Sequence, residues 1–252
     1  MEERNMNKAD IKPKRILLVE DNHLNQLIMS RLLKKMDIEV VESNSGKEAL
    51  KHAIQEKYYM IFICVFIPID VGCETTENIR DLSLINKDIP IIAVSSNNDG
   101  SLNDEIFKCG ITDIISKPFV EEELIALFNK YPEKSTSDEF RVFNSKAFES
   151  FYSDDKLKKE IISIFMSEKV SDLDRINMAF DSNDKNNIYE TIHYMKGSFS
   201  YLKADNILEL TQKILDLLKD NKLNDALLLK DLFINKYESL NEELNIYSSK
   251  FN

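Results

Sequence analysis

Five short apolar runs, each followed by a helical pattern, occupy the first half of the chain and limit the folds open to it. The runs are Arg15–Val19, Ile38–Val41, Met60–Phe66, Ile91–Val94 and Asp113–Ser116. The run Met60–Phe66 is apolar throughout, which is typical of a central strand covered on both faces. This alternation of strands and helices predicts an α/β doubly wound fold with a five-stranded parallel sheet.

The alternation stops near Tyr131, and no strand signal follows it. Stripes of apolar residues at spacings of three and four then predict four helices. They run through Leu157–Phe180, Ile188–Leu202, Ile207–Leu218 and Leu228–Tyr247. Helices of this length can close a core as an all-α antiparallel four-helix bundle.

These patterns predict two domains. The segment 132–139 (PEKSTSDE) has no apolar residue and is typical of a linker. We therefore predict a flexible N-terminus over 1–13, an α/β domain over 14–131, the linker over 132–139 and the helical bundle over 140–252.

Charge and hydropathy exclude several classes of function. The net charge is −11, and both halves carry more acidic than basic side chains. Neither half offers the basic surface that nucleic-acid phosphates require, so no nucleic-acid partner is expected. No apolar run approaches the roughly 18 residues of a membrane span, and residues 1–13 do not form a secretory signal. We predict a cytoplasmic protein without membrane contact.

The three cysteines are Cys64, Cys73 and Cys109. Their number is odd and their spacing fits no metal-ligand motif. Neither a disulfide framework nor a zinc site is therefore expected.

Polar residues follow the apolar runs at positions that carry a family resemblance. They are the acidic pair Glu20 and Asp21, the hydroxyl Ser95, and Lys117 followed by Pro118. Together with Ile16–Ile28 (ILLVEDNHLNQLI), this set resembles CheY-like response-regulator receiver domains, as far as about residue 131. All these residues are expected at the carboxyl ends of parallel strands. The resemblance implies that the acids hold Mg²⁺, while the hydroxyl and the lysine bind phosphoryl oxygens on an aspartate that ends the third strand.

The third strand departs from this pattern. Alignment by Pro68 and Gly72 puts Cys64 where the phosphoacceptor aspartate is expected. A thiol is a poor Mg²⁺ ligand, and burial beside carboxylates disfavours the thiolate, so phosphocysteine is rejected. Cys64 is then an inert core residue or, alternatively, a redox-sensing thiol.

A second departure lies three residues before Lys117. Receivers usually have Tyr or Phe there, and this chain has Ile114. Loss of both the acceptor and the aromatic reporter predicts a degenerate receiver, or pseudo-receiver, that phosphate no longer switches. Glu20 and Asp21 are then inherited remnants or a weak Mg²⁺ site. No tightly bound cofactor is expected.

The second predicted helix of the bundle carries the other resemblance. The segment Thr191–Leu202 (TIHYMKGSFSYL) resembles the phosphoacceptor helix of histidine-containing phosphotransfer (HPt) domains, and the likeness covers roughly residues 140–250. It implies that His193 is the phosphoacceptor and that Lys196, Gly197 and Ser198 complete the motif.

Helix geometry gives physical reasons for two of these residues. Lys196 lies on the same side as His193, where its ammonium can meet phosphoryl charge. A side chain at position 197 would cover the His193 ring, so a mid-helix glycine, which costs about 1 kcal/mol, keeps it accessible. The core stripe through Ile192 and Met195 puts the His193 ring at the border of the buried face. The alternative is a surface histidine beside a helix-packing glycine.

These features predict a two-component phosphorelay protein. His193 exchanges a phosphoryl group with aspartates on partner receivers, which belong to a hybrid histidine kinase or a response regulator and supply the Mg²⁺. The receiver-like half is a docking, dimerising or regulatory module. None of the five glycines forms a Gly-rich ATP loop, so no kinase activity is expected. The alternative is a non-catalytic adaptor that binds or sequesters a histidine kinase or response regulator.

Overall fold

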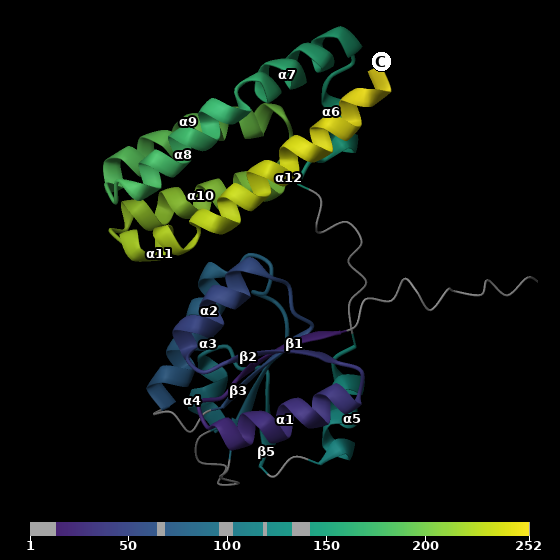
Figure 1. The fold of residues 1–252 in the computed structure, drawn as a ribbon, viewed down its shortest axis with the longest axis vertical. Helices are drawn as coiled ribbons and strands as arrows, with labels where there is room; N and C mark the ends of the chain where they lie inside the picture. The colour runs from purple at the N-terminus through teal and green to yellow at the C-terminus, as the bar shows by residue number, and fades with distance from the viewer. Residues whose placement is uncertain (1–13, 65–68, 96–102, 118–119, 133–141, 252) are drawn as a thin grey trace, which may run out of the picture. The chain divides into compact units, whose positions relative to one another are not determined.

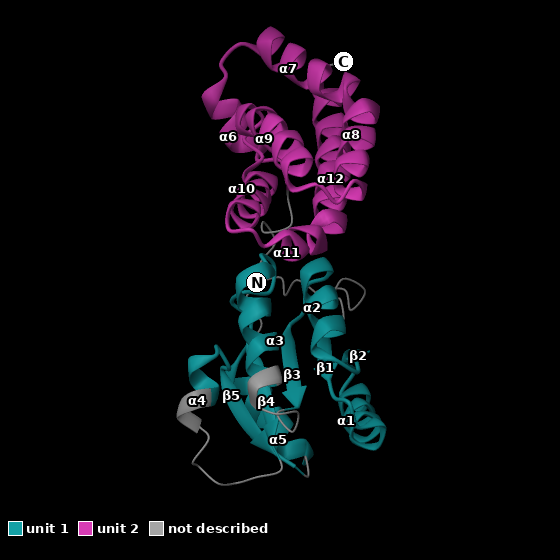
Figure 2. Ribbon diagram, turned by 90° about the vertical axis from the view of Figure 1, so that its left-hand side faces the viewer, with its two compact units in different colours: residues 1–134 teal, residues 135–252 magenta. Residues whose placement is uncertain are grey.

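The structure is a computed structural model that describes residues 14–64, 69–95, 103–117, 120–132 and 142–251. The chain divides into two compact units, residues 1–134 and 135–252 (Figure 2). This division falls within the predicted linker 132–139, most of which lies outside the described residues, as do residues 1–13. The finer domain bounds stay predictions.

The first unit contains a parallel five-stranded sheet. Its strands are β1 (Arg15–Val19), β2 (Glu39–Ser43), β3 (Met60–Cys64), β4 (Ile91–Ser95) and β5 (Asp113–Ser116). They are ordered β2-β1-β3-β4-β5, and every neighbouring pair is parallel. The predicted doubly wound α/β class is confirmed. Residues 65 and 66 of the predicted third strand lie outside the described residues.

Five helices of this unit cover the sheet. They are α1 (His23–Lys35), α2 (Gly46–Gln55), α3 (Ile69–Leu82), α4 (Asn103–Lys108) and α5 (Glu121–Lys130). Helices α1 and α5 lie on one face, and α2, α3 and α4 lie on the other (Figure 1). The sequence from Glu74 to Leu84 is polar but compatible with a helix, and α3 begins five residues before Glu74.

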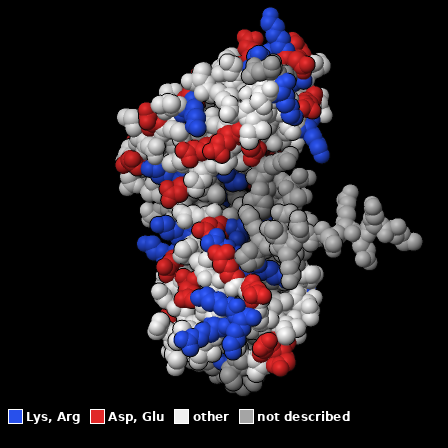
Figure 3. Space-filling model, turned by 45° about the vertical axis from the view of Figure 1, so that its right-hand side comes forward, with Lys and Arg blue, Asp and Glu red and all other residues white. Residues whose placement is uncertain are grey.

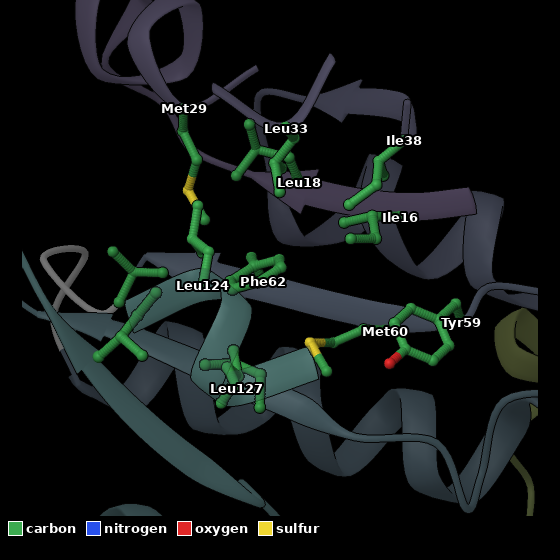
Figure 4. Packing of buried hydrophobic residues seen from close by; sticks show 13 residues of the cluster. Ile16, Leu18, Met29, Leu33, Ile38, Tyr59, Met60, Phe62, Leu124 and Leu127 are labelled. Carbon is green, nitrogen blue, oxygen red and sulfur yellow. The ribbon is translucent and has the colours of Figure 1, made fainter. Parts of the chain in front are cut away.

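The core between the sheet and helices α1 and α5 is continuous. Met29 and Leu33 of α1 face Phe62 of β3 (Figure 4). Leu124 and Leu127 of α5 belong to the same cluster. Burying one such side chain stabilises the fold by roughly 1.5–3 kcal/mol. This packing fixes the strand ends relative to one another.

In the part of the second unit that the structure describes, every regular element is a helix. It contains α6 (Ser145–Phe151), α7 (Asp155–Ser167), α8 (Lys169–Asp181), α9 (Lys185–Tyr201), α10 (Asp205–Lys219), α11 (Leu223–Leu228), α12 (Lys230–Ser248) and a terminal 3₁₀ turn (Ser249–Phe251). The predicted helical bundle is confirmed, but the prediction of a single helix through Leu157–Phe180 is wrong. Helices α7 and α8 meet at Glu168, whose φ of −89° and ψ of −6° remain helical. The apolar stripe therefore continues across the break.

Aromatic rings form the centre of this bundle. Phe199 of α9 contacts Phe165 of α7 and Phe233 and Tyr237 of α12, at centroid separations of 6.0–6.2 Å. The hydroxyl of Tyr237 donates to Asp172 of α8 at 3.0 Å, which satisfies two buried polar groups. The buried residues of α9, which include Phe199, lie on one face of the helix. Across the described residues, no helix is long and apolar enough to cross a membrane.

Candidate functional site

Three side chains gather at the carboxyl ends of the central strands, and we call them the strand-end cluster. Glu20 follows β1, Cys64 ends β3 and Lys117 follows β5. Lys117 Nζ donates to Glu20 Oε2 at 2.5 Å and lies 3.1 Å from Cys64 Sγ. The side chains of Lys117 and Glu20 are only 13% and 4% exposed, and Cys64 is fully buried.

Glu20 and Lys117 each stabilise the charged form of the other. Burial would raise the pKa of Glu20, but hydrogen bonds from Lys117 and from the Asn22 backbone N–H hold the pKa below its ordinary value. Burial likewise would lower the pKa of Lys117, but its hydrogen bonds to Glu20 and Cys64 raise it. The pair is therefore ionised across the neutral pH range.

Sequence reasoning missed Asn22 as part of this arrangement. Its backbone N–H donates to Glu20 Oε1 at 3.0 Å. Its side chain also caps α1 by accepting from the N–H groups of Leu24 and Asn25. An asparagine directly before a helical pattern is the signal that points to such a cap.

The other predicted receiver residues lie in different surroundings. Asp21 is exposed, and Ile114 lies half-buried opposite Ala93 in the β4–β5 register. The carbonyl of Ser95 accepts the backbone N–H of Lys117 at 2.8 Å, which holds Lys117 at the strand end. The residue Pro118 lies outside the described residues.

The donor set of this cluster does not fit the Mg²⁺ ion that the receiver resemblance implies. One oxygen of Glu20 is engaged by the Lys117 ammonium, and the third expected ligand is a sulfur atom. Magnesium requires hard oxygen donors in octahedral geometry. The described residues contain no group of three His, Cys, Asp or Glu side chains placed to hold a metal ion.

The structure corrects the prediction for the cysteines. Cys73 of α3 and Cys109, directly after α4, form a disulfide with a Cα–Cα separation of 5.2 Å. The prediction of no disulfide was wrong because number and sequence spacing do not show which residues the fold brings together. The third cysteine, Cys64, is not disulfide-bonded.

His193 lies near the middle of α9, and its side chain is exposed. This differs from the expected position at the border of the core. Successive helical residues turn by about 100°, so His193 lies about 160° from Met195, which is buried. The buried face of α9 is centred on the opposite side from the ring.

The residues around His193 form what we call the histidine face, made of Tyr189, His193, Lys196 and Gly197. The Tyr189 ring lies parallel to the imidazole, with an interplanar angle of 7° and a centroid separation of 5.8 Å. Sequence reasoning missed Tyr189, although an aromatic residue four positions before the histidine was the available signal.

Lys196 is oriented by the neighbouring helix. Its Nζ donates to Gln212 Oε1 of α10 at 2.5 Å. The amide of Gln212 in turn donates to Asp216 Oδ1 at 2.8 Å. Gln212 was also missed, because nothing in the sequence pairs α9 with α10 in this register. The ammonium is held at the edge of the histidine face.

Gly197 is exposed, and a Cβ built there meets no described atom within 4 Å. The glycine therefore does not serve close packing among the described residues, which argues against the alternative of a helix-packing glycine. Ser198 lies about 140° around the helix from His193. It lines a largely apolar hollow of about 410 Å³ between α7 and α9 instead.

Charge on the surface is mixed. On the face drawn in Figure 3, basic side chains border acidic ones on both units, rather than forming one broad basic area. This agrees with the net charge of −11.

Comparison with known families decides what these two units are. Residues 16–129 match the family described as response regulator receiver domain, and residues 160–243 match the Hpt domain family. The chain is a receiver domain followed by an Hpt domain. Both are components of two-component phosphorelay signalling, and the Hpt domain is a phosphotransfer carrier rather than a kinase.

Relatives share the two-domain region. The sensor protein GacS of Pseudomonas syringae pv. syringae is 25% identical over 89% of this chain and 27% of its own length. The sensor protein EvgS of Escherichia coli K12 is 21% identical over 93% of this chain and 20% of its own length. A solved receiver domain of a Pseudomonas aeruginosa sensor histidine kinase is 26% identical, covers 48% of this chain and 98% of its own, and gives a TM-score of 0.44. The chain therefore spans about a quarter or less of the sensor proteins that it matches.

Proposed function

We propose that this chain carries a phosphoryl group on His193 and exchanges it with aspartates of partner receiver domains. The observation that carries the proposal is the histidine face. An exposed imidazole lies beside a glycine with open space above it, and a lysine ammonium is held at its edge. A partner aspartyl phosphate can approach this surface without moving any described side chain over Gly197.

The transfer is a displacement at phosphorus. A neutral ring nitrogen of His193 attacks the phosphorus atom of the partner's aspartyl phosphate. The N–P bond forms as the O–P bond breaks, and the electron pair returns to the aspartate carboxylate. Lys196 is the nearby cation that offsets the phosphoryl charge during transfer. The reverse sequence passes the group to the next receiver.

We further propose that the receiver domain does not carry phosphate itself. Cys64 occupies the end of β3, and the Lys117 ammonium already pairs with Glu20. The domain lacks a carboxylate at position 64 that would be both nucleophile and metal ligand. Mg²⁺ belongs to the partner receiver in this proposal, and this chain binds no cofactor tightly.

Helix α1 supports a docking or regulatory role for the receiver domain. Three apolar side chains with helical spacing are exposed on it: Leu24 at 62%, Leu27 at 38% and Ile28 at 47%. Exposed apolar groups in one stripe are typical of an interaction surface. The partners we propose are the receiver domain of a hybrid histidine kinase or a response regulator, in the cytoplasm, with neither nucleic acid nor membrane as a partner.

A second candidate function is that of an adaptor without phosphotransfer. The exposed apolar side chains of α1 favour it, because they offer a binding surface. The strand-end cluster also favours it, because its groups are paired with one another and are not available for reaction. In this alternative the chain sequesters a kinase or response regulator, and His193 is never phosphorylated. Neither proposal assigns kinase activity to this chain.

Incubation with a phosphorylated receiver separates the two functions. The donor is a purified receiver domain that carries radiolabelled phosphate on its aspartate, and the acceptor is the full chain. Phosphotransfer predicts label on this chain that acid removes and alkali preserves, as expected of phosphohistidine. A stable complex with no label on this chain would establish the adaptor instead.

A further inference from the structure

Two of the three cysteines lie together, away from the strand-end cluster. Cys73 is in the first turns of α3, and Cys109 directly follows α4. Their Cα atoms are 5.2 Å apart, within the usual range of 4.4–6.8 Å for a disulfide. The two thiols are therefore placed to react with each other without movement of the backbone.

A second link joins the same parts of the domain. Arg80 of α3 donates to the carbonyl of Gly110 from Nε at 3.1 Å and from Nη2 at 2.9 Å. Its Nη1 donates to the carbonyl of Ile89 at 2.7 Å. Arg80 thus ties α3 to the residue after Cys109 by hydrogen bonds that do not involve the disulfide.

Exposure differs among the three thiols. Cys73 is partly exposed, whereas Cys109 is only 7% exposed and Cys64 only 1%. Exposed disulfides are generally the labile ones, so attack by a small thiol is expected at Cys73, the more exposed of the two bonded residues. The burial of Cys64 keeps it out of such exchange.

We propose that Cys73 and Cys109 form a reversible dithiol–disulfide site in the receiver domain. The oxidant class is a small-molecule disulfide such as glutathione disulfide. The Cys73 thiolate attacks one sulfur, which gives a mixed disulfide and releases one glutathione thiolate. The Cys109 thiolate then attacks the Cys73 sulfur, which closes the protein disulfide and releases the second. Two protein thiols are oxidised, one glutathione disulfide is reduced, and two protons leave the protein.

Closing this bond restrains a particular segment. Cys109 and Gly110 connect α4 to β5, and Lys117 follows β5. The disulfide thus holds the α4 end against α3, while in the dithiol form the hydrogen bonds from Arg80 to the neighbouring Gly110 remain. Slower amide hydrogen exchange over residues 106–112 is expected in the oxidised state.

The test equilibrates the full chain in glutathione buffers of different reduced-to-oxidised ratios. After an acid quench, free thiols are alkylated and located by mass spectrometry. We expect one cooperative transition in which Cys73 and Cys109 lose alkylation together, with the circular dichroism spectrum unchanged and Cys64 protected until denaturation. A stable glutathione adduct as the end product, an intermolecular dimer, or a bond that changes state only on unfolding would overturn the proposal.

Single substitutions assign the two roles. Cys109→Ser should stop at a stable glutathione adduct on Cys73, because the resolving thiol is absent. Cys64→Ser is the matched control and should leave the transition unchanged. Equal hydrogen exchange over residues 106–112 in the oxidised and reduced wild-type chain would refute the restraint on the α4 end.

Discussion

The strand-end cluster and the histidine face differ in where their polar groups are directed. In the cluster, Glu20, Cys64 and Lys117 satisfy one another inside the domain. On the histidine face, the His193 ring is exposed and the space above Gly197 is open. A site that binds a partner must leave hydrogen-bonding capacity for it, and in this chain the Hpt domain does so more clearly than the receiver domain.

The difference also separates stability from activity. The cluster contains a largely buried ion pair, so its loss should destabilise the receiver domain. The histidine face contributes little burial, so its residues can be changed with little effect on folding. The following substitutions test whether the two regions divide these roles.

The largest expected effect is on phosphate acceptance by His193→Gln. The glutamine lacks the ring nitrogen that attacks phosphorus, so labelling by a phosphorylated receiver should be lost entirely. The melting temperature should change little, because the side chain is exposed. The chain has only two other histidines, His23 and His52, and His23→Gln and His52→Gln are matched controls that should keep full labelling. Undiminished labelling of His193→Gln would move the acceptor elsewhere.

Removal of Lys117 should have the largest effect on stability. Lys117→Met leaves the Glu20 carboxylate buried without its cation. We expect the free energy of unfolding to fall by about 3–5 kcal/mol, as is typical when one partner of a buried ion pair is removed. Glu20→Gln is the comparison, since its amide oxygen still accepts from Lys117, and it should cost less. Denaturant unfolding at pH 7 measures both free energies. Equal, small losses would show that the pair does not stabilise the domain.

The pKa shifts of Glu20 and Lys117 determine how the stability of the receiver domain depends on pH. The lowered pKa of Glu20 adds stability that is present above its ordinary value of 4.5 and lost as the pH falls through the folded value. The raised pKa of Lys117 adds stability that is present below 10.5 and lost as the pH rises through the folded value. In Lys117→Met, Glu20 keeps its burial and the hydrogen bond from the Asn22 backbone N–H but loses its cation, so its protonated form becomes more favourable than in the wild type. The free-energy gap between wild type and Lys117→Met should therefore narrow below pH 4.5, and a gap that widens there would contradict the pairing.

Cys64→Asp asks whether the thiol is what separates the strand-end cluster from a working receiver site. The new carboxylate would add a hard oxygen donor beside Glu20 and Asp21. Saturating Mg²⁺ should raise the melting temperature of the variant and not that of the wild type. At a Mg²⁺ concentration 100 times the dissociation constant, binding adds about 2.7 kcal/mol. Equal stabilisation of both proteins would mean that Cys64 is not the obstacle and that Asp21 and Glu20 suffice.

Switching should not return in the same variant. Ile114 provides no aromatic ring to report phosphorylation, so the Cys64→Asp chain should accept some phosphate from acetyl phosphate without a matching change elsewhere in the domain. Amide exchange before and after phosphorylation measures this, and broad changes across α4 and β5 would oppose it.

Gly197→Ala is expected to change stability only slightly, and in the stabilising direction. The Cβ meets open space, and alanine is about 1 kcal/mol more favourable than glycine within a helix, so the Hpt domain should become slightly more stable. Phosphotransfer should nevertheless slow, because the methyl group leans toward His193. Gly197→Leu should slow it further. A variant that is both more stable and equally fast would show that Gly197 does not serve access.

Much of the fold could be predicted from the sequence. The run Met60–Phe66 and the four other apolar runs predicted the five strands of the parallel sheet, because buried parallel strands need continuous apolar residues. The break at Glu168 could not be predicted, since its backbone stays helical and the apolar stripe continues. Cys73 and Cys109 were missed because a contact across 36 residues depends on how α3 and α4 pack.

The candidate sites were predictable to a similar degree. The motif around His193 located the histidine face, but its position next to Ile192 in the sequence set the ring too near the core, because successive helical residues turn by about 100°. The Glu20–Lys117 pair and the Lys196–Gln212 bond join separate elements, and no local pattern encodes such partners. Tertiary packing decides them.

Mapping the phosphoryl group on the wild-type chain tests the central claim most directly. The full chain is exposed in parallel to a phosphorylated receiver domain and to acetyl phosphate with Mg²⁺, then digested rapidly at neutral pH, where both phosphohistidine and aspartyl phosphate persist, and sequenced by tandem mass spectrometry. The account predicts one phosphoryl group on His193 from the receiver donor and none on residues 14–131 from either donor. A phosphoryl group on Cys64, Asp21 or any other receiver-domain residue, or an unmodified His193, would contradict it.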